Sequence, residues 1–140
     1  MARTVQVNEG QLRYVQNISV GPHSLQGDES IEVGGGDTGA NPHELLLAAL
    51  GTCASITVRM YADRKQWPLD GVRIDLSYAQ TQDSAAGSRD VRNAEEIELN
   101  ISFWGYLSDE QRTRLLQIAR KCPVHRILTS SIPIRSRLAS

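Results

Sequence analysis

The sequence predicts an α+β protein with antiparallel sheets around one long central helix. Three observations lead to this prediction: short strand patterns before residue 34, a helical run from Asn41 to about Lys65, and two strands of alternating pattern after Pro68. Two shorter helices and a final strand are expected to follow, so the order is βββ-α-ββ-αα-β. We find neither an internal repeat nor a second domain, and we expect a single domain over residues 1–140.

The first third of the chain reads as a meander of short strands. Thr4–Val7 alternates weakly, and Leu12–Val15 continues into Ile18–Val20 before a Gly-Pro break. A third strand is expected over Ser24–Val33, where a triple glycine ends it.

The central helix has clear ends. Asn41 is a plausible cap, Pro42 suits the first helical turn, and the run stops before Pro68. From Leu45 to Leu50 the helix is apolar on nearly every side. Such a helix must be buried all round, and a second copy of the chain would cover it. We therefore expect a homodimer with this helix at its centre.

Two strands follow the helix, because apolar residues alternate with polar ones over Val72–Tyr78 and Ile97–Phe103. The polar stretch from Gln80 to Ala94 between them is expected to be a long connection.

The last quarter should hold two helices and a strand. Ser108 and Gln111 have the spacing of a capping box, which opens a helix that runs through Ala119. Cys122-Pro123 begins a second short helix, and Ile132–Ile134 is expected to form an edge strand.

Composition and charge exclude several classes of protein. The chain is 40% hydrophobic and has a net charge of −1 from 15 basic and 16 acidic residues, without a basic run, so we expect no nucleic-acid partner. Its start lacks the apolar segment of a signal peptide, and its longest apolar run is too short to span a membrane. We therefore expect a cytoplasmic protein with no membrane partner. The scattered histidines and cysteines predict no metal site, and we expect no cofactor.

Asp37-Thr38-Gly39 is the signature triplet of an aspartic protease. That chemistry needs two carboxylates about 3 Å apart, each fixed at the end of a rigid strand. Here three glycines precede Asp37 and a helix begins soon after, so we expect the triplet to be a turn with side-chain to backbone hydrogen bonds.

The two cysteines, Cys53 and Cys122, lie 69 positions apart. They are either separate core residues or a redox pair. Local chemistry favours Cys122 as the reactive thiol, because it starts a helix between Lys121 and the cations His125 and Arg126.

The stretch GGGDTGANPHELLLAALGTCASITVRMYADRK, with CPVHRIL much later, resembles the OsmC/Ohr family of thiol-dependent hydroperoxide reductases. The resemblance covers essentially the whole chain. It implies an intertwined homodimer with active sites at the subunit interface, in which Cys53 attacks the peroxide and Cys122 resolves the product. This reverses the order of roles that local chemistry favours.

The resemblance also implies a glutamate and an arginine that hold the attacking thiolate. The position ten residues before Cys53 is His43, and the neighbouring acid is Glu44. Glu44 is either this acid, acting in the partner's site, or a helix-terminal acid that complements the dipole. Arg13 is the best candidate for the arginine, although the local pattern does not match closely.

The predicted function is that of a cysteine-based peroxidase that reduces organic hydroperoxides in oxidative-stress defence and is restored by an external dithiol. Its predicted site residues are Cys53, Cys122, Glu44 and Arg13. The alternative is a non-catalytic dimer of the same fold that binds a small apolar ligand.

Overall fold

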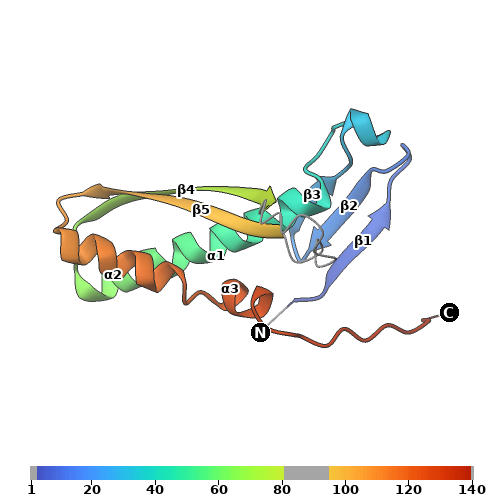
Figure 1. Ribbon diagram of the computed structural model, residues 1–140. Coiled ribbons are helices and arrows are strands. Elements are labelled where there is room, and N and C mark those ends of the chain that lie inside the picture. The colour runs from blue at the N-terminus through green and yellow to red at the C-terminus, as the bar shows by residue number, and fades with distance from the viewer. Residues whose placement is uncertain (1–2, 81–94, 140) are drawn as a thin grey trace, which may run out of the picture. The chain divides into compact units, whose positions relative to one another are not determined.

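The computed structural model describes residues 3–80 and 95–139. They form a mixed α+β fold with two antiparallel sheets, as the sequence predicts (Figure 1). The chain gathers into two compact units, Met1–Ala48 and Ala49–Ser140, which we describe one at a time. The single domain over residues 1–140 stays a prediction, and most of the predicted connection from Gln80 to Ala94 lies outside the described residues.

The first unit holds a three-stranded sheet in the order β1-β2-β3. Its strands are β1 (Val5–Glu9), β2 (Gln16–Val20) and β3 (His23–Gly27), and a short 3-10 helix, η1 (Ile31–Val33), follows. Apolar residues face one another across the strands, since Val7 lies opposite Ile18 and Ile18 opposite Leu25. Val7 and Leu25 nevertheless remain 58% and 50% exposed, so nothing in this unit covers that face fully.

Two predictions for this unit are wrong in detail. Leu12–Val15 is a turn and not a strand: the Val15 amide donates to the Leu12 carbonyl, and Arg13 has a positive φ of 25°. The third strand ends at Gly27, because the chain then bends around the carboxylate of Asp28.

The long helix α1 (Pro42–Lys65) has the predicted ends. Its buried residues form a stripe with a spacing of about one turn. They are Leu50, Gly51, Ala54, Val58 and Ala62. The opposite face is open, with Ile56 49% and Met60 65% exposed, so the all-round burial expected from the sequence is not met within one chain.

By length and composition alone, α1 could cross a bilayer, because its most apolar 18 residues have a mean hydropathy of 1.5. The same composition is found in the core helices of soluble proteins, and the Leu50–Ala62 stripe packs inside the second unit.

The second unit places helices on one face of a two-stranded sheet (Figure 1). Strand β4 (Leu69–Gln80) pairs with β5 (Glu95–Gly105). The predicted alternation is confirmed along β5, where exposed and half-buried residues alternate. The half-buried side chains that pack against the core are those of Ile97, Leu99, Ile101 and Phe103. Arg112 ties helix to sheet by donating to the carbonyl oxygens of Phe103 and Gly105 at 2.9 and 3.3 Å.

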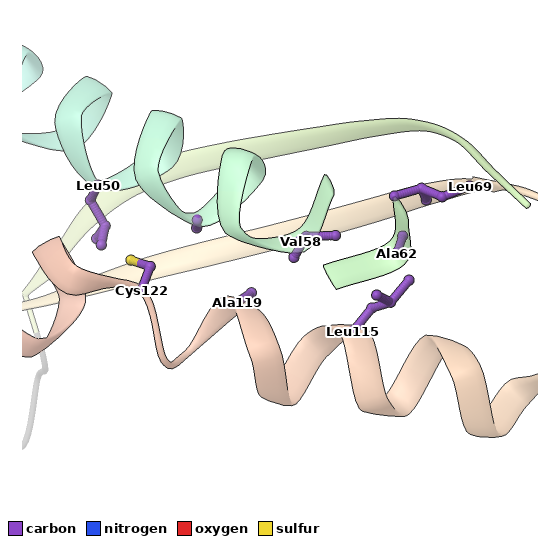
Figure 2. Packing of buried hydrophobic residues seen from close by; sticks show 8 residues of the cluster. Leu50, Val58, Ala62, Leu69, Leu115, Ala119 and Cys122 are labelled. Atoms are coloured by element: carbon purple, nitrogen blue, oxygen red, sulfur yellow. The ribbon is translucent and has the colours of Figure 1, made fainter. Parts of the chain in front are cut away.

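Helix α2 (Asp109–Ala119) begins with the predicted capping box between Ser108 and Gln111, and α3 (Pro123–Leu128) follows. Leu115 and Ala119 of α2 pack with Val58 and Ala62 of α1 in one buried cluster. Cys122 lies at the Leu50 end of this cluster, as Figure 2 shows.

The predicted last strand is wrong for the single chain. Residues 131–139 are assigned to neither helix nor strand, and Ile134 and Leu138 are 87% and 93% exposed. A strand forms only where a neighbouring strand accepts and donates its backbone hydrogen bonds, and an apolar sequence pattern alone does not provide that neighbour.

Candidate functional site

The structure brings Cys53 and Cys122 together. Cys53 lies in α1, half-buried, and its carbonyl accepts a hydrogen bond of 2.7 Å from the Thr57 hydroxyl. Cys122 comes from the link between α2 and α3 and is fully buried. Cys53 packs against the buried cluster that contains Cys122, and both cysteines are free thiols.

Cys122 also caps helix α3. Its Sγ accepts a hydrogen bond of 3.3 Å from the His125 amide, and Pro123 occupies the first helical turn. The sequence placed Cys122 correctly at a helix N-terminus, where unpaired amides stabilise a negative charge.

Burial nevertheless raises the pKa of the Cys122 thiol above its usual range. The His125 amide opposes this effect, while the neighbouring Cys53 adds to it. Desolvation therefore outweighs the helix terminus, and Cys122 is held as a neutral thiol. The expectation from local sequence that Cys122 is an activated thiolate is wrong, because the burial came from tertiary packing.

Glu44 has a structural partner in the first unit. Its carboxylate accepts from the Asn41 amide at 2.8 Å, and the Asn41 side chain accepts from the Glu44 amide at 2.8 Å. This is a reciprocal capping box, which satisfies two amides at the start of α1. It confirms Asn41 as the cap and gives the Glu44 carboxylate a role that needs no catalysis.

Arg13 lies in the turn between β1 and β2, exposed, with its guanidinium 5.5 Å from the centre of the Tyr14 ring. The ion pairs that join described residues are Arg59–Asp63 and Arg73–Asp75, so Arg13 and Glu44 form none with that part of the chain. Arg13 and Glu44 belong to the first unit, and the two cysteines belong to the second.

The Asp-Thr-Gly loop is organised by a residue that the sequence did not single out. Asp28 is 3% exposed, and its Oδ2 accepts from the amides of Gly36 and Thr38 and from the Thr38 hydroxyl at 2.7 Å. These hydrogen bonds, that of the Thr38 hydroxyl first, lower the pKa of Asp28. The triplet lies in a loop outside helix and strand, but the predicted side-chain to backbone hydrogen bond is wrong for Thr38, whose hydroxyl donates to the Asp28 carboxylate. The only advance signal was an acid six residues before a triple glycine.

The first unit also has an open apolar cavity of about 490 Å³. Val7, Tyr14, Ile18, Val33 and Leu45 supply much of its lining. Among the described residues, no group of three or more histidine, cysteine, aspartate or glutamate side chains could hold a metal ion.

A buried thiol packed near a half-buried one, in an α+β fold, defines a two-cysteine thiol protein. The particular family follows from the sequence: the chain matches the OsmC-like protein family over residues 34–137 and belongs to that family.

Solved structures share the fold at low sequence identity. An organic hydroperoxide resistance protein OsmC from Legionella pneumophila is 17% identical, with 92% of this chain and 90% of that chain covered and a TM-score of 0.65. An OsmC-like protein from Mycoplasma pneumoniae is 16% identical, with 91% and 87% covered and a TM-score of 0.69. An organic hydroperoxide resistance protein from Elizabethkingia anophelis is 16% identical, with 92% and 89% covered and a TM-score of 0.65. No curated protein matches the sequence.

Proposed function

We propose that the chain is a cysteine-based reductase of organic hydroperoxides, which works as a homodimer in the cytoplasm. The observation that carries the proposal is the packing of Cys53 against the buried cluster that holds Cys122, which brings together two thiols from distant segments. The names of the Legionella and Elizabethkingia relatives support the class of substrate.

The proposed reaction has three steps. The Cys53 thiolate attacks the distal oxygen of the hydroperoxide, the O–O bond breaks, and the protonated alkoxide leaves as an alcohol. Cys53 is then a sulfenic acid, which condenses with the Cys122 thiol to form a disulfide and release water. An external dithiol gives two electrons and two protons to restore both thiols.

The burial of the two cysteines supports this order of roles. Cys53 is half-buried and so within reach of a substrate, whereas Cys122 is fully buried behind it. A raised pKa also suits Cys122 to the resolving role, because it keeps this thiol from competing for the peroxide.

To test the proposal, the reduced protein is treated with one equivalent of cumene hydroperoxide, and its intact mass is measured without reductant. We expect the loss of two hydrogen atoms, mapped to a Cys53–Cys122 link. Cys122→Ser should stop at a sulfenic acid on Cys53, and Cys53→Ser should not react. A sulfenic acid on Cys122 in the Cys53→Ser variant would reverse the roles, and two free thiols in the wild type would refute the reaction.

The open face of α1 supports the dimer. Ile56 and Met60 are exposed on the face of α1 opposite its buried stripe, and Ile134 and Leu138 add exposed apolar surface. Faces of this kind are usually covered by a partner. Sedimentation equilibrium should give a dimer for the wild type and a monomer for Ile56→Glu, and a monomeric wild type would contradict the proposal.

The apolar cavity favours a second candidate, a dimer that binds a small apolar ligand without turnover. A volume of about 490 Å³ and a mostly apolar lining are typical of such sites. Saturable binding of a fluorescent fatty acid by a protein whose thiols ignore hydroperoxides would support this candidate over the peroxidase.

A further inference from the structure

Tyr61, near the end of α1, is surrounded by positive charge. The cationic groups of Arg64, Lys65 and Arg114 lie 5.6, 5.8 and 5.5 Å from the centre of its ring. Trp67 packs edge-on against the same ring, with 5.5 Å between the ring centres. We call these five residues the Tyr61 patch.

Arg114 is drawn into the patch from a different helix. Its Nε donates to the Tyr61 hydroxyl at 3.1 Å, and one of its terminal nitrogens donates to Gln117 at 3.1 Å. Glu110 stands four residues earlier on α2, the spacing that favours an ion pair, yet Arg114 does not pair with it. The hydrogen bond from Arg114, followed by the charges of Arg114, Lys65 and Arg64, lowers the pKa of Tyr61.

The three cations of the patch form no ion pair with the described residues. The ion pairs found there, Arg59–Asp63 and Arg73–Asp75, include none of its three cations. Arg64 and Lys65 complement the C-terminus of α1, but Arg114 lies in the middle of α2, where its own helix gives no such reason. Arg64 and Lys65 are exposed, so the charge is presented on a surface.

The position of the patch relative to Cys53 suggests a function for it. Tyr61 follows Cys53 by eight residues of one helix, a rise of about 12 Å along the axis. A standard protein interface covers about 800 Å² of each partner and is therefore about 30 Å across. A partner seated on the patch therefore lies within one interface width of Cys53 along the helix axis.

We propose that the Tyr61 patch docks the acidic face of a protein that carries the dithiol reductant. The inference rests on the proposed function, which requires such a dithiol. One thiolate of the partner attacks the Cys53 sulfur of the disulfide, forms a mixed disulfide and releases Cys122 as a thiol. The partner's second thiol then displaces Cys53, so that two electrons and two protons pass from partner to chain.

Two matched peptides test the docking. Both have a Cys-Gly-Pro-Cys core, which one flanks with glutamates and the other with glutamines. The oxidised protein is prepared with diamide, and the rate constant for its reduction by each peptide is measured at low salt. Electrostatic steering accelerates association by factors of about 10 to 1,000, so we expect the glutamate peptide to be at least about tenfold faster. The difference should vanish in about 0.5 M salt.

The variant Arg64→Gln with Lys65→Gln should bring the ratio of the two rates close to one. Arg135→Gln with Arg137→Gln removes the same net charge from the C-terminal residues and should keep the wild-type ratio. A ratio near one in the wild type, or an equal loss in the control variant, would overturn the docking proposal.

Two further measurements separate the possible failures. If hydroperoxide never forms the disulfide, the proposed function fails, whatever the peptides do. If the disulfide forms and dithiothreitol reduces it while the peptide ratio stays near one, only the docking proposal fails. Patch-dependent flotation with phosphatidylglycerol vesicles and a peptide ratio near one would assign the patch to a lipid surface, which also overturns the proposal.

Discussion

Leu115→Ala tests whether α2 and α1 share one core. Leu115 is 0% exposed and is among the largest fully buried side chains of the described residues. Truncation of a fully buried leucine costs about 3 to 5 kcal/mol, since it removes apolar contacts and leaves a cavity. The adjacent Leu116 is 40% exposed, so Leu116→Ala should cost about 1 kcal/mol or less and serves as the matched control.

The expected difference is large enough to measure by thermal unfolding. At about 2.1 cal/mol/K per residue, the unfolding entropy of a chain of 140 residues is about 0.3 kcal/mol/K. A loss of 3 kcal/mol therefore lowers the Tm by about 10 °C, and a loss of 1 kcal/mol lowers it by about 3 °C. Both variants are compared with the wild type at one protein concentration, because the proposed dimerisation would make the Tm depend on concentration.

Leu115→Ala should also loosen Cys122, which belongs to the same buried cluster. We expect its reaction with a thiol reagent to become faster in Leu115→Ala and to stay slow in Leu116→Ala. Equal Tm shifts for the two variants would refute the packing of α2 on α1 through Leu115.

Three other predictions concern the first unit. Glu44→Gln should retain the capping box and any peroxidase activity, while Glu44→Ala should cost about 1 kcal/mol in unfolding free energy. A large loss of activity in Glu44→Gln with unchanged stability would show that this acid is catalytic. Because the folded state lowers the pKa of Asp28, its carboxylate stabilises the fold above the unfolded pKa of about 4, and this stability is lost as the pH falls further. The unfolding midpoint should therefore fall less steeply with decreasing pH in Asp28→Asn than in the wild type. Identical slopes would contradict this prediction. A Cβ on Gly39 would lie 2.3 Å from the Gln26 carbonyl oxygen, whereas on Gly27 its nearest neighbour would be 3.5 Å away, so chemical denaturation should find Gly39→Ala much less stable than Gly27→Ala.

Local signals in the sequence were enough to predict most helices and strands. Asn41 and Pro42 mark the start of α1, and Ser108 with Gln111 marks the start of α2, because a cap is made by residues close together in the chain. The alternating pattern along β5 predicted which side chains turn inward for the same local reason.

Features that depend on distant contacts were missed. The strand expected at Ile132–Ile134 has the right pattern but pairs with no strand of residues 3–80 or 95–139. Leu12–Val15 has a strand-like composition, but hydrogen bonds between Leu12, Val15 and Gly10 close it into a turn.

The candidate site was predicted in part. The sequence identified both cysteines, and the fold brings them together. Local reasoning misjudged Cys122, because the helix terminus is visible in the sequence whereas the burial that outweighs it is not. The Tyr61 patch was missed, since Arg114 reaches it from 53 residues away.

The sulfur of Cys122 both caps α3 and takes part in the proposed disulfide. The hydrogen bond from the His125 amide to this sulfur stabilises the thiol form and is weakened when the sulfur enters a disulfide. For a two-electron couple, about 1.4 kcal/mol corresponds to 30 mV, so a cap worth about 1 kcal/mol raises the reduction potential by about 20 mV. In the proposed reaction, the short helix α3 would thus make the cysteine pair a slightly stronger oxidant, which an external dithiol would reduce more readily.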